Sequence, residues 1–500
     1  MEKYDVVVVG AGNAALSAAI SAREIGSKVL VLEKGPKSKR GGNSFFTDGA
    51  IRFAYGDING IQTVIPELTE RKIKTISMPI YENQDFYNDI MRVTKNQSNP
   101  DLVNHLVNNS FETILWMKEQ GVEFELNENQ CFERNGVLKF WGGLPIRTKR
   151  KGIGLIEALL KKAEEQSIDF KYEARAVELE KSSDGISGIY YKDVNKKRYF
   201  IETSSVVLAC GSFEASKEDR IKFLGKEWAN AIVRGTEFNT GDGIRMAVAV
   251  GAQKAGHYSG CHAHTTDYNA PKVGDFSKPG DIYKKSSYPL GLIINNKGER
   301  FVDEGADFRN YTYAKYGKET LKQPEQKAFQ IYDSQVISML RKEYELDEAT
   351  KISAKTLEEL ADKMGINPSR FKEMIDEYNA SVQDGDYNPS IKDGKSTKNI
   401  TPPKSNWALK FEKAPFYAFP VTCGITFSFG GVATNTNGEV LDSNGEAISG
   451  LYAVGEMVGG LFYHNYPGGS GLMSGSVFGR TAGTSAAKYT QNKSVNFMKY

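Results

Sequence analysis

A few small and acidic residues near the N-terminus have the types and the spacing that bind a dinucleotide. Gly10, Gly12 and Ala15 form the pattern GxGxxA directly after the valines at 6–9, and Glu33 follows further on. The first glycine permits a tight turn, the second lets the backbone approach a pyrophosphate, and the small third residue lets a helix pack on the strand. Glu33 can accept hydrogen bonds from an adenosine ribose, and its charge disfavours a 2′-phosphate. We therefore expect a dinucleotide with an unphosphorylated ribose.

The five histidines are the next candidates for chemistry. His257, His262 and His264 fall within eight positions, and His464 lies beside a C-terminal glycine-rich turn. The spacing of His262 and His264 could ligate a metal, but no nearby Asp or Glu completes such a set, so we expect no metal. The four cysteines are scattered without a CxxC pair, which argues against disulfides, iron–sulfur clusters and c-type haem.

The elements that must position these residues are a strand at 6–9, an Ala-rich helix over 13–25 and a second strand over 28–32. The unbroken β-branched run suits a parallel strand that is covered on both faces. Further strands are expected at 170–179, 186–192 and 198–202, and within 205–213, where a buried strand ends at a glycine; helices are expected at 84–95, 101–120 and 155–166. The pattern predicts an α/β fold built on a parallel sheet.

Composition excludes several classes of protein. The chain has 500 residues and a net charge of +2, so no electrostatic field for nucleic acid is indicated. No apolar segment of about 20 residues is present, so we expect no membrane span. The first strand begins within the first ten residues, which leaves no room for a signal peptide. These features favour a reducing, cytoplasmic setting.

A second glycine-rich loop, Arg40-Gly41-Gly42-Asn43-Ser44, follows Glu33. An NAD site usually needs no such loop, whereas FAD extends further along the sheet. The combination GxGxxA, Glu33 and RGGNS resembles the flavoprotein subunit family of fumarate reductase and succinate dehydrogenase. Some members attach FAD to a His in this loop, and this chain has Asn43-Ser44 instead. The resemblance implies non-covalent FAD.

The resemblance also implies a domain organisation. A Rossmann-type FAD-binding domain, of the kind found in two-dinucleotide-fold flavoproteins, is interrupted by an α+β capping domain. We expect the FAD-binding domain at 1–256 and 426–490, the capping domain at 257–425 and a frayed tail at 491–500. FAD is predicted to contact four groups of residues. They belong to the nucleotide fingerprint, the second glycine-rich loop, the ends of the strands and the start of the last helix. They are Gly10, Gly12, Asn13, Ala14, Ala15, Glu33, Lys34, Arg40, Gly41, Gly42, Asn43, Ser44, Ala176, Val177, Ala209, Cys210, Gly211, Thr240, Gly241, Asp242, Gly455, Glu456, Ser470, Gly471 and Leu472.

The family phrase NxxGxRFVxE, here over 295–304, precedes the candidate proton-transfer residue Arg309. The family places an Arg shortly after this phrase as proton donor or acceptor above the substrate. The alternative is that Arg309 forms a salt bridge to Asp303, Glu304 or Asp307. His262 falls where the family places a His that binds a substrate carboxylate.

The chain then departs from fumarate reductases. Their acidic proton relay should fall near 284–287, which reads Lys-Lys-Ser-Ser, and their second substrate His should fall near Phe427. Their arginine in the final glycine-rich turn aligns with Tyr466. Two carboxylate-binding positions are therefore missing, and fumarate itself is not expected as substrate.

Two relatives of that family differ at the same positions. The phrase YPGGS over 466–470 resembles 3-ketosteroid dehydrogenases, in which the Tyr hydroxyl polarises a 3-keto group. Longer phrases, above all RFVDEGADFRNYTYAKYG over 300–317, resemble FAD-dependent tricarballylate dehydrogenases. The resemblance implies an FAD oxidoreductase that acts on CH–CH groups, converting tricarballylate to cis-aconitate. The open alternative is a 3-ketosteroid dehydrogenase or enone reductase, because an apolar aromatic pocket also suits such substrates.

Candidate site residues follow from these resemblances. The predicted catalytic residues are Arg309, Tyr466, His262 and Tyr288, and the predicted substrate-binding residues are Arg52, His464, Phe427, Gly469 and Ser470. Packing beside FAD remains the alternative for Tyr466, and a surface position the alternative for Arg52. A further hypothesis is a flavin subunit that mainly serves an electron-transfer partner. Tricarballylate-type enzymes pass electrons through a separate membrane partner to quinone, which implies a cytoplasmic protein that is peripheral to the membrane.

Overall fold

A six-stranded sheet forms the base of the molecule in the computed structural model, which describes residues 2–134, 136–140, 143–278 and 280–497. Its order is β10 (Asp169–Lys171), β3 (Val29–Leu32), β2 (Val6–Val9), β14 (Ser205–Leu208), β22 (Ala447–Ala453) and β21 (Glu439–Leu441). All neighbours are parallel except β21 and β22. The carboxyl ends of the parallel strands therefore meet at one edge, where ligands of such sheets bind.

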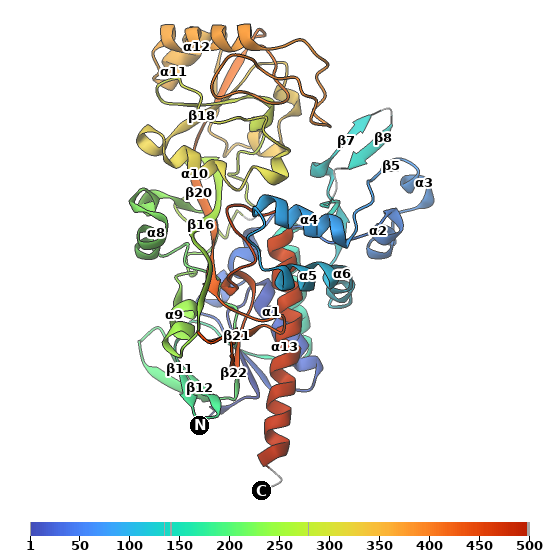
Figure 1. Cartoon of the computed structure of the whole chain (residues 1–500), viewed down its shortest axis with the longest axis vertical. Coiled ribbons are helices and arrows are strands. Elements are labelled where there is room, and N and C mark those ends of the chain that lie inside the picture. Colours follow the sequence, from blue (N-terminus) through green and yellow to red (C-terminus); the bar gives the residue numbers. More distant parts are fainter. Residues whose placement is uncertain (1, 135, 141–142, 279, 498–500) are drawn as a thin grey trace.

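Helices α1 (Asn13–Glu24) and α13 (Ser470–Phe497) pack against each other below this edge (Figure 1). Glycines make the close approach possible, because a Cβ atom at Gly483 would lie 2.1 Å from the carbonyl oxygen of Ala18. The tail predicted at 491–500 differs from the structure, in which α13 continues to Phe497. Residues 498–500 of that prediction lie outside the described residues.

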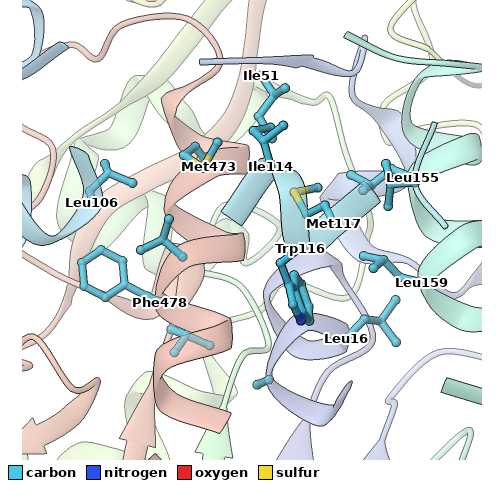
Figure 2. Close-up of a cluster of buried hydrophobic side chains, with 14 of the residues drawn as sticks. Leu16, Ile51, Leu106, Ile114, Trp116, Met117, Leu155, Leu159, Met473 and Phe478 are labelled. Carbon is cyan, nitrogen blue, oxygen red and sulfur yellow. The ribbon is translucent and has the colours of Figure 1, made fainter. Parts of the chain in front are cut away.

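The largest hydrophobic core lies between these helices and the sheet. Leu16, Trp116, Met473 and Phe478 come together there from α1, α6 (Ser110–Glu119) and α13 (Figure 2). Helix α7 (Lys151–Glu165) adds Leu155 and Leu159. The helix predicted over 101–120 is two helices, α5 (Pro100–Asn108) and α6, which meet at Asn109.

A four-stranded sheet lies beside the base, in the order β1 (Glu2–Lys3), β13 (Arg198–Glu202), β12 (Gly185–Lys192) and β11 (Arg175–Ser182). The strand predicted over 170–179 is divided between the two sheets, since β10 ends at Lys171 and β11 begins at Arg175. Helix α9 (Asp242–Ala249) packs beside β11 and brings Asp242 to the nucleotide end of the fold.

Two long antiparallel strands, β16 (Lys254–Asp267) and β20 (Phe416–Val432), run from the base into the upper part of the molecule (Figure 1). There β20 joins β15 (Ile232–Val233), β18 (Ala328–Tyr332) and β19 (Ile352–Ala354), and β18 joins β17 (Leu292–Asn295). Helices α11 (Leu357–Met364) and α12 (Pro368–Ser381) cover this sheet at the end of the molecule farthest from the base. The predicted domain boundaries fall within β16 and β20, and the division itself stays a prediction.

Residues 50–148 form a smaller lobe beside the base. It contains the helices α2 (Ile58–Val64), α3 (Glu70–Ile73), α4 (Asn83–Val93), α5 and α6. Short strands complete it: β4 (Ala50–Ile51), β5 (Ile76–Ser77), β6 (Phe124–Leu126), β7 (Cys131–Arg134), β8 (Val137–Phe140) and β9 (Ile146–Thr148).

Helices α8 (Lys217–Leu224) and α10 (Tyr316–Leu321) pack against β16. The site lies where the base, the lobe and the upper sheet meet.

Candidate active site

A long cavity opens along the carboxyl edge of the six-stranded sheet. It encloses about 1490 Å³ including its mouth and the open solvent there. Gly10 turns the chain there with φ +108°, and a Cβ atom at this position would lie 2.5 Å from the carbonyl oxygen of Ala209. The first glycine of the fingerprint is therefore required by both the turn and the neighbouring strand.

Helix α1 points its N-terminus into this cavity. Its N-cap residue is Gly12, which has no side chain to cap the helix, and no acidic residue occupies the first turn. The backbone N–H of Asn13 donates to Ser44 Oγ at 3.1 Å, so the second glycine-rich loop closes over the helix end. An uncapped N-terminus of a twelve-residue helix, lined by glycine, is a site for a pyrophosphate.

Glu33 follows β3 and lies beside the Gly10–Gly12 turn, because β3 pairs with β2 and the backbone N–H of Gly10 donates to the carbonyl oxygen of Leu32 at 2.8 Å. Its Oε1 accepts a hydrogen bond from the backbone N–H of Gly35 at 2.7 Å, and burial raises the pKa of its carboxyl. Next to it, Lys34 Nζ donates to Thr240 Oγ1 at 2.5 Å and to Asp242 Oδ2 at 3.0 Å. Asp242 also binds Arg175 and Arg245, each at 2.7 Å, so Lys34 shares this carboxylate with two further cations.

Most of the predicted FAD-binding residues line this cavity. They are Gly10, Gly12, Asn13, Ala14, Glu33, Lys34, Gly42, Asn43, Ser44, Ala176, Ala209, Cys210, Gly211, Asp242, Gly455, Glu456, Gly471 and Leu472. The remaining ones are not part of the lining: Ala15, Arg40, Gly41, Val177, Thr240, Gly241 and Ser470. The glycine turn, the N-terminus of α1 and the ribose acceptor lie together in a cavity that continues to Phe427 and Tyr466, and this arrangement fits an extended FAD.

A second cavity of about 860 Å³ adjoins the first. The two share a wall made of Asn43, Thr47, Thr426, Tyr466, Gly471 and Leu472. The second cavity continues to Arg234, His262, His264, Lys284 and Arg309. A molecule in the second cavity would therefore lie next to one end of a cofactor in the first.

Arg309 brings a positive charge into the second cavity. Its Nη2 donates to Asn310 Oδ1 at 2.9 Å, and its guanidinium lies 5.3 Å from the ring centre of Tyr313. No carboxylate in the described part of the chain lies within 4.0 Å of its nitrogens. The salt bridges considered from the sequence do not form.

Those three acids have other partners. Glu304 binds Arg300, Asp307 binds Arg92 at 2.9 Å, and Asp303 accepts from the backbone N–H of Ser405.

His262 is buried in the wall of the second cavity. Strand pairing sets it opposite Phe427, and the two rings are 5.7 Å apart. Neither ring nitrogen of His262 has a hydrogen-bond partner. Burial, with a smaller contribution from Arg234, lowers the pKa of His262 well below its usual value. The imidazole is therefore neutral and has one donor and one acceptor free for a ligand.

Tyr466 stands between the two cavities, just before helix α13. The hydroxyl of Tyr313 donates to the hydroxyl of Tyr466 at 2.7 Å, and the His262 ring lies 5.0 Å from each of the two tyrosine rings. Burial, and next the proximity of Tyr313, raise the pKa of Tyr466 well above its usual value. Tyr466 keeps its proton at neutral pH and can donate it in a hydrogen bond.

Several predicted residues lie away from the cavity linings. Tyr288 is fully buried, and its hydroxyl bonds Thr312 Oγ1 at 2.6 Å. His464 bonds Gln97 and its backbone N–H donates to His257 Nδ1. Arg52 is not a surface residue, since it is fully buried against Asp89, Tyr81 and the carbonyl oxygen of Gly468. It holds the turn that carries Gly469, which does line the second cavity.

The sequence interpretation missed part of this cavity. Arg234 follows the short strand β15; it binds Asp281 and donates to Thr426 Oγ1 at 2.7 Å. Lys284 binds Asp48 at 2.9 Å. No sequence motif identifies these residues as part of a site, because their partners lie 47 to 236 positions away along the chain. Tyr313 lies within the sequence phrase over 300–317 that resembles the tricarballylate dehydrogenases. That phrase was the signal that could have identified it as a site residue.

Two general features complete the site. Within the ranges that the structure describes, no group of three or more His, Cys, Asp or Glu could hold a metal ion. In the same ranges, the helices are too short or too polar for a transmembrane span.

Comparisons with known proteins identify relatives over nearly the whole chain. The model of the family described as FAD binding domain matches residues 5–472. The probable fumarate reductase Ifc3 of Shewanella frigidimarina is 29% identical over 495 residues, which cover 98% of this chain and 76% of that protein. The vinyl phenol reductase of Lactiplantibacillus plantarum is 28% identical over 535 residues, covering 99% and 98%.

A solved structure is similar in fold. The 3-ketosteroid-Δ4-(5α)-dehydrogenase from Rhodococcus jostii RHA1 superposes with a TM-score of 0.70 at 24% identity, covering 97% of each chain.

Proposed function

The chain belongs to the FAD binding domain family, and on that premise we propose that it reduces, or in reverse forms, a C=C bond next to one carboxylate or carbonyl group. It is an FAD-dependent oxidoreductase, as are its relatives. When bound, FAD supplies the hydride that is transferred to or from carbon. The observation that carries the proposal is Arg309, a guanidinium without a carboxylate partner in the cavity beside the cofactor site.

The polar end of the substrate is assigned to Arg309, His262 and Tyr466. Arg309 presents a planar set of N–H donors that matches a carboxylate, or a carbonyl oxygen that gains charge during reaction. Neutral His262 adds an unpartnered donor, and Tyr466 adds a hydroxyl at the wall shared with the cofactor cavity. These donors stabilise negative charge as it develops next to the double bond.

The proton at carbon is also assigned to Arg309. In the reducing direction Arg309 donates a proton to the carbon next to the activating group, and in the oxidising direction it accepts that proton. The guanidinium ordinarily stays protonated, so it acts as an acid only toward a strongly basic carbon. Phe427, Tyr466 and Phe462 line the adjoining wall and exclude water from this step.

A substrate with one polar end fits this cavity better than one with three carboxylates. Two of its three Arg and Lys side chains already have carboxylate partners, Arg234 with Asp281 and Lys284 with Asp48. Only Arg309 is left to neutralise an anion. The apolar body of such a substrate would lie against Tyr466 and Leu144, whereas Phe427 lines the adjoining cofactor cavity.

Tricarballylate is the second candidate. The observation that favours it is the presence of Lys284 and Arg234 in the same cavity as Arg309. Their release from Asp48 and Asp281 would supply two more cations.

A steady-state comparison under anaerobic conditions tests these alternatives. The holoenzyme is supplied with electrons from reduced methyl viologen, and kcat/KM is measured for an arylacrylate, an enone steroid, fumarate and cis-aconitate. We expect the arylacrylate or the enone to be reduced with the highest kcat/KM. A higher value for cis-aconitate would replace the proposal by the tricarballylate reaction, and turnover of none of the four would refute it.

Electrons must also reach or leave the cofactor. We propose a separate electron-transfer partner, because relatives of this chain include fumarate reductases named for a cytochrome. Non-covalent binding of FAD is likewise proposed, since Asn43 and Ser44 occupy the loop in which some relatives carry the attaching His.

A further inference from the structure

Two glutamates meet at the wall of the cofactor cavity. Glu456 follows β22 in a short 3-10 turn and lines the cavity. Glu214 follows β14 and is fully buried, outside the lining. No role in binding or chemistry has been assigned so far to Glu214.

The two carboxyl groups share the same hydrogen-bond donors. Asn43 Nδ2 donates to Glu214 Oε1 at 2.8 Å and to Glu456 Oε1 at 3.0 Å. Asn239 Nδ2 donates to Glu214 Oε1 at 2.7 Å and to Glu456 Oε2 at 3.2 Å. Ser212 Oγ donates to the other oxygen of Glu214 at 2.6 Å. Shared amide donors place the two groups close together.

This pair forms no salt bridge with a cation of the described residues. Among the described residues, no Lys, Arg or His nitrogen lies within 4.0 Å of either carboxylate. Arg220 approaches Glu214, but its guanidinium donates to the backbone oxygen of that residue and to those of Trp228 and Ala229.

Besides Arg220, whose charge acts on Glu214, the titratable groups among the described residues that face the pair are Tyr466 and Cys261. Burial raises the pKa of both, so both are neutral at neutral pH and add no positive charge.

We propose that Glu214 and Glu456 hold one proton between them, and that Glu214 is a positioning residue that keeps the cofactor-facing carboxyl pair singly protonated. Two adjacent carboxylates in a buried site cannot both ionise without a large cost. Burial raises the pKa of both groups, and the charge of Glu214 raises that of Glu456 further. The shared proton removes one negative charge from the wall and gives it a carboxyl O–H donor.

This inference rests on FAD as the cofactor and is independent of the substrate. It is tested by infrared spectroscopy of the holoprotein as a function of pH. The carbonyl stretch of a protonated carboxylic acid is distinct from the stretches of a carboxylate. Glu214→Gln and Glu456→Gln keep the size of each side chain, and Glu178→Gln, at an exposed position, serves as the matched control.

We expect the unmodified holoprotein to show a carboxylic-acid band that disappears as pH rises through the raised pKa of the pair. In Glu214→Gln the midpoint of that titration should fall by at least about one pH unit, because the like charge is gone. Glu456→Gln should shift it in the same direction, and Glu178→Gln should leave it unchanged.

Two results would overturn the inference. One is the absence of such a band at neutral pH from the unmodified holoprotein, which is decisive even if a variant does not fold. The other is a midpoint that is the same in Glu214→Gln as in the unmodified protein. Neither depends on turnover, so a failure here is distinguishable from a failure of the proposed function.

Discussion

Replacement of Arg309 by Met should abolish most of the activity while leaving the fold and the cofactor in place. Met has nearly the same length and no charge. In the structure Arg309 makes one hydrogen bond, to Asn310, and one cation–π contact, with Tyr313. Their loss should cost about 1 kcal/mol of the free energy of unfolding. Arg309 does not line the cofactor cavity, so the FAD content should not change.

The loss of activity has two parts. A charge-assisted hydrogen bond to a carboxylate is worth about 1.5–3 kcal/mol, which corresponds to a rise in KM of roughly 10- to 150-fold. A positioned proton-transfer group contributes about 10²–10⁴-fold to the rate, so kcat should fall by at least ~10²-fold. Arg309→Lys keeps the charge but not the planar fork, and we expect it to retain the binding better than the rate.

The assay is anaerobic single turnover. The reduced holoenzyme is mixed with an arylacrylate, and the return of oxidised flavin absorbance is followed across substrate concentrations, which separates binding from rate. Arg198→Met, on the exposed strand β13, is the matched control and should behave like the unmodified enzyme. A rate for Arg309→Met within a factor of about three of the unmodified enzyme would remove Arg309 from the mechanism.

Four further predictions follow from individual contacts. Glu33→Ala should weaken FAD binding by roughly 10- to 100-fold, because a charged acceptor is lost, and a flavin fluorescence titration measures it; unchanged affinity would exclude the ribose assignment. Tyr466→Phe should lower turnover by roughly 10-fold with normal FAD content, and equal turnover would leave only a packing role. Arg52→Met should lower the free energy of unfolding by about 3 kcal/mol, because Asp89, Tyr81 and the carbonyl oxygen of Gly468 lose a fully buried donor, and a denaturant titration would show no change if these contacts were unimportant. The folded-state pKa of His262 lies below its unfolded value, so the unfolded chain binds more protons and stability should fall as pH drops below about 6.5. The Tm of His262→Gln should depend less steeply on pH in that range, and an equal slope would contradict the neutral imidazole.

The nucleotide end of the fold was predictable because its signals are local. A β-branched run, two glycines, an Ala-rich helix and Glu33 lie within 30 positions and must be neighbours in any βαβ unit. The structure has that unit as β2, α1 and β3, within one residue of the predicted bounds.

The second cavity was only partly predictable, because its walls depend on long-range register. His262 lies opposite Phe427 because β16 pairs with β20. The two residues are more than 160 positions apart in the sequence. Arg234 and Lys284 enter the cavity through loops that carry no motif. Conversely, Arg309 has three acids within six positions, and each of them binds a different partner, so the sequence alone could not decide whether Arg309 forms a salt bridge.

Two helices show the same limit. The apolar pattern over 101–120 fits one helix, but the chain bends at Asn109 so that α5 and α6 pack on different parts of α13. The last helix continues into the segment predicted as a tail at 491–500, because glycines at 475, 479 and 483 let the helix lie against α1. Local helix propensity does not indicate such a contact.

The most direct test of the central claim is a stoichiometric reoxidation of the flavin. The holoenzyme is reduced without oxygen, mixed with one equivalent of an arylacrylate or an enone, and assayed for both oxidised FAD and the saturated product. The account predicts one saturated product for each flavin reoxidised. A reduced flavin that oxygen reoxidises, but that no conjugated acid or ketone does, would contradict it.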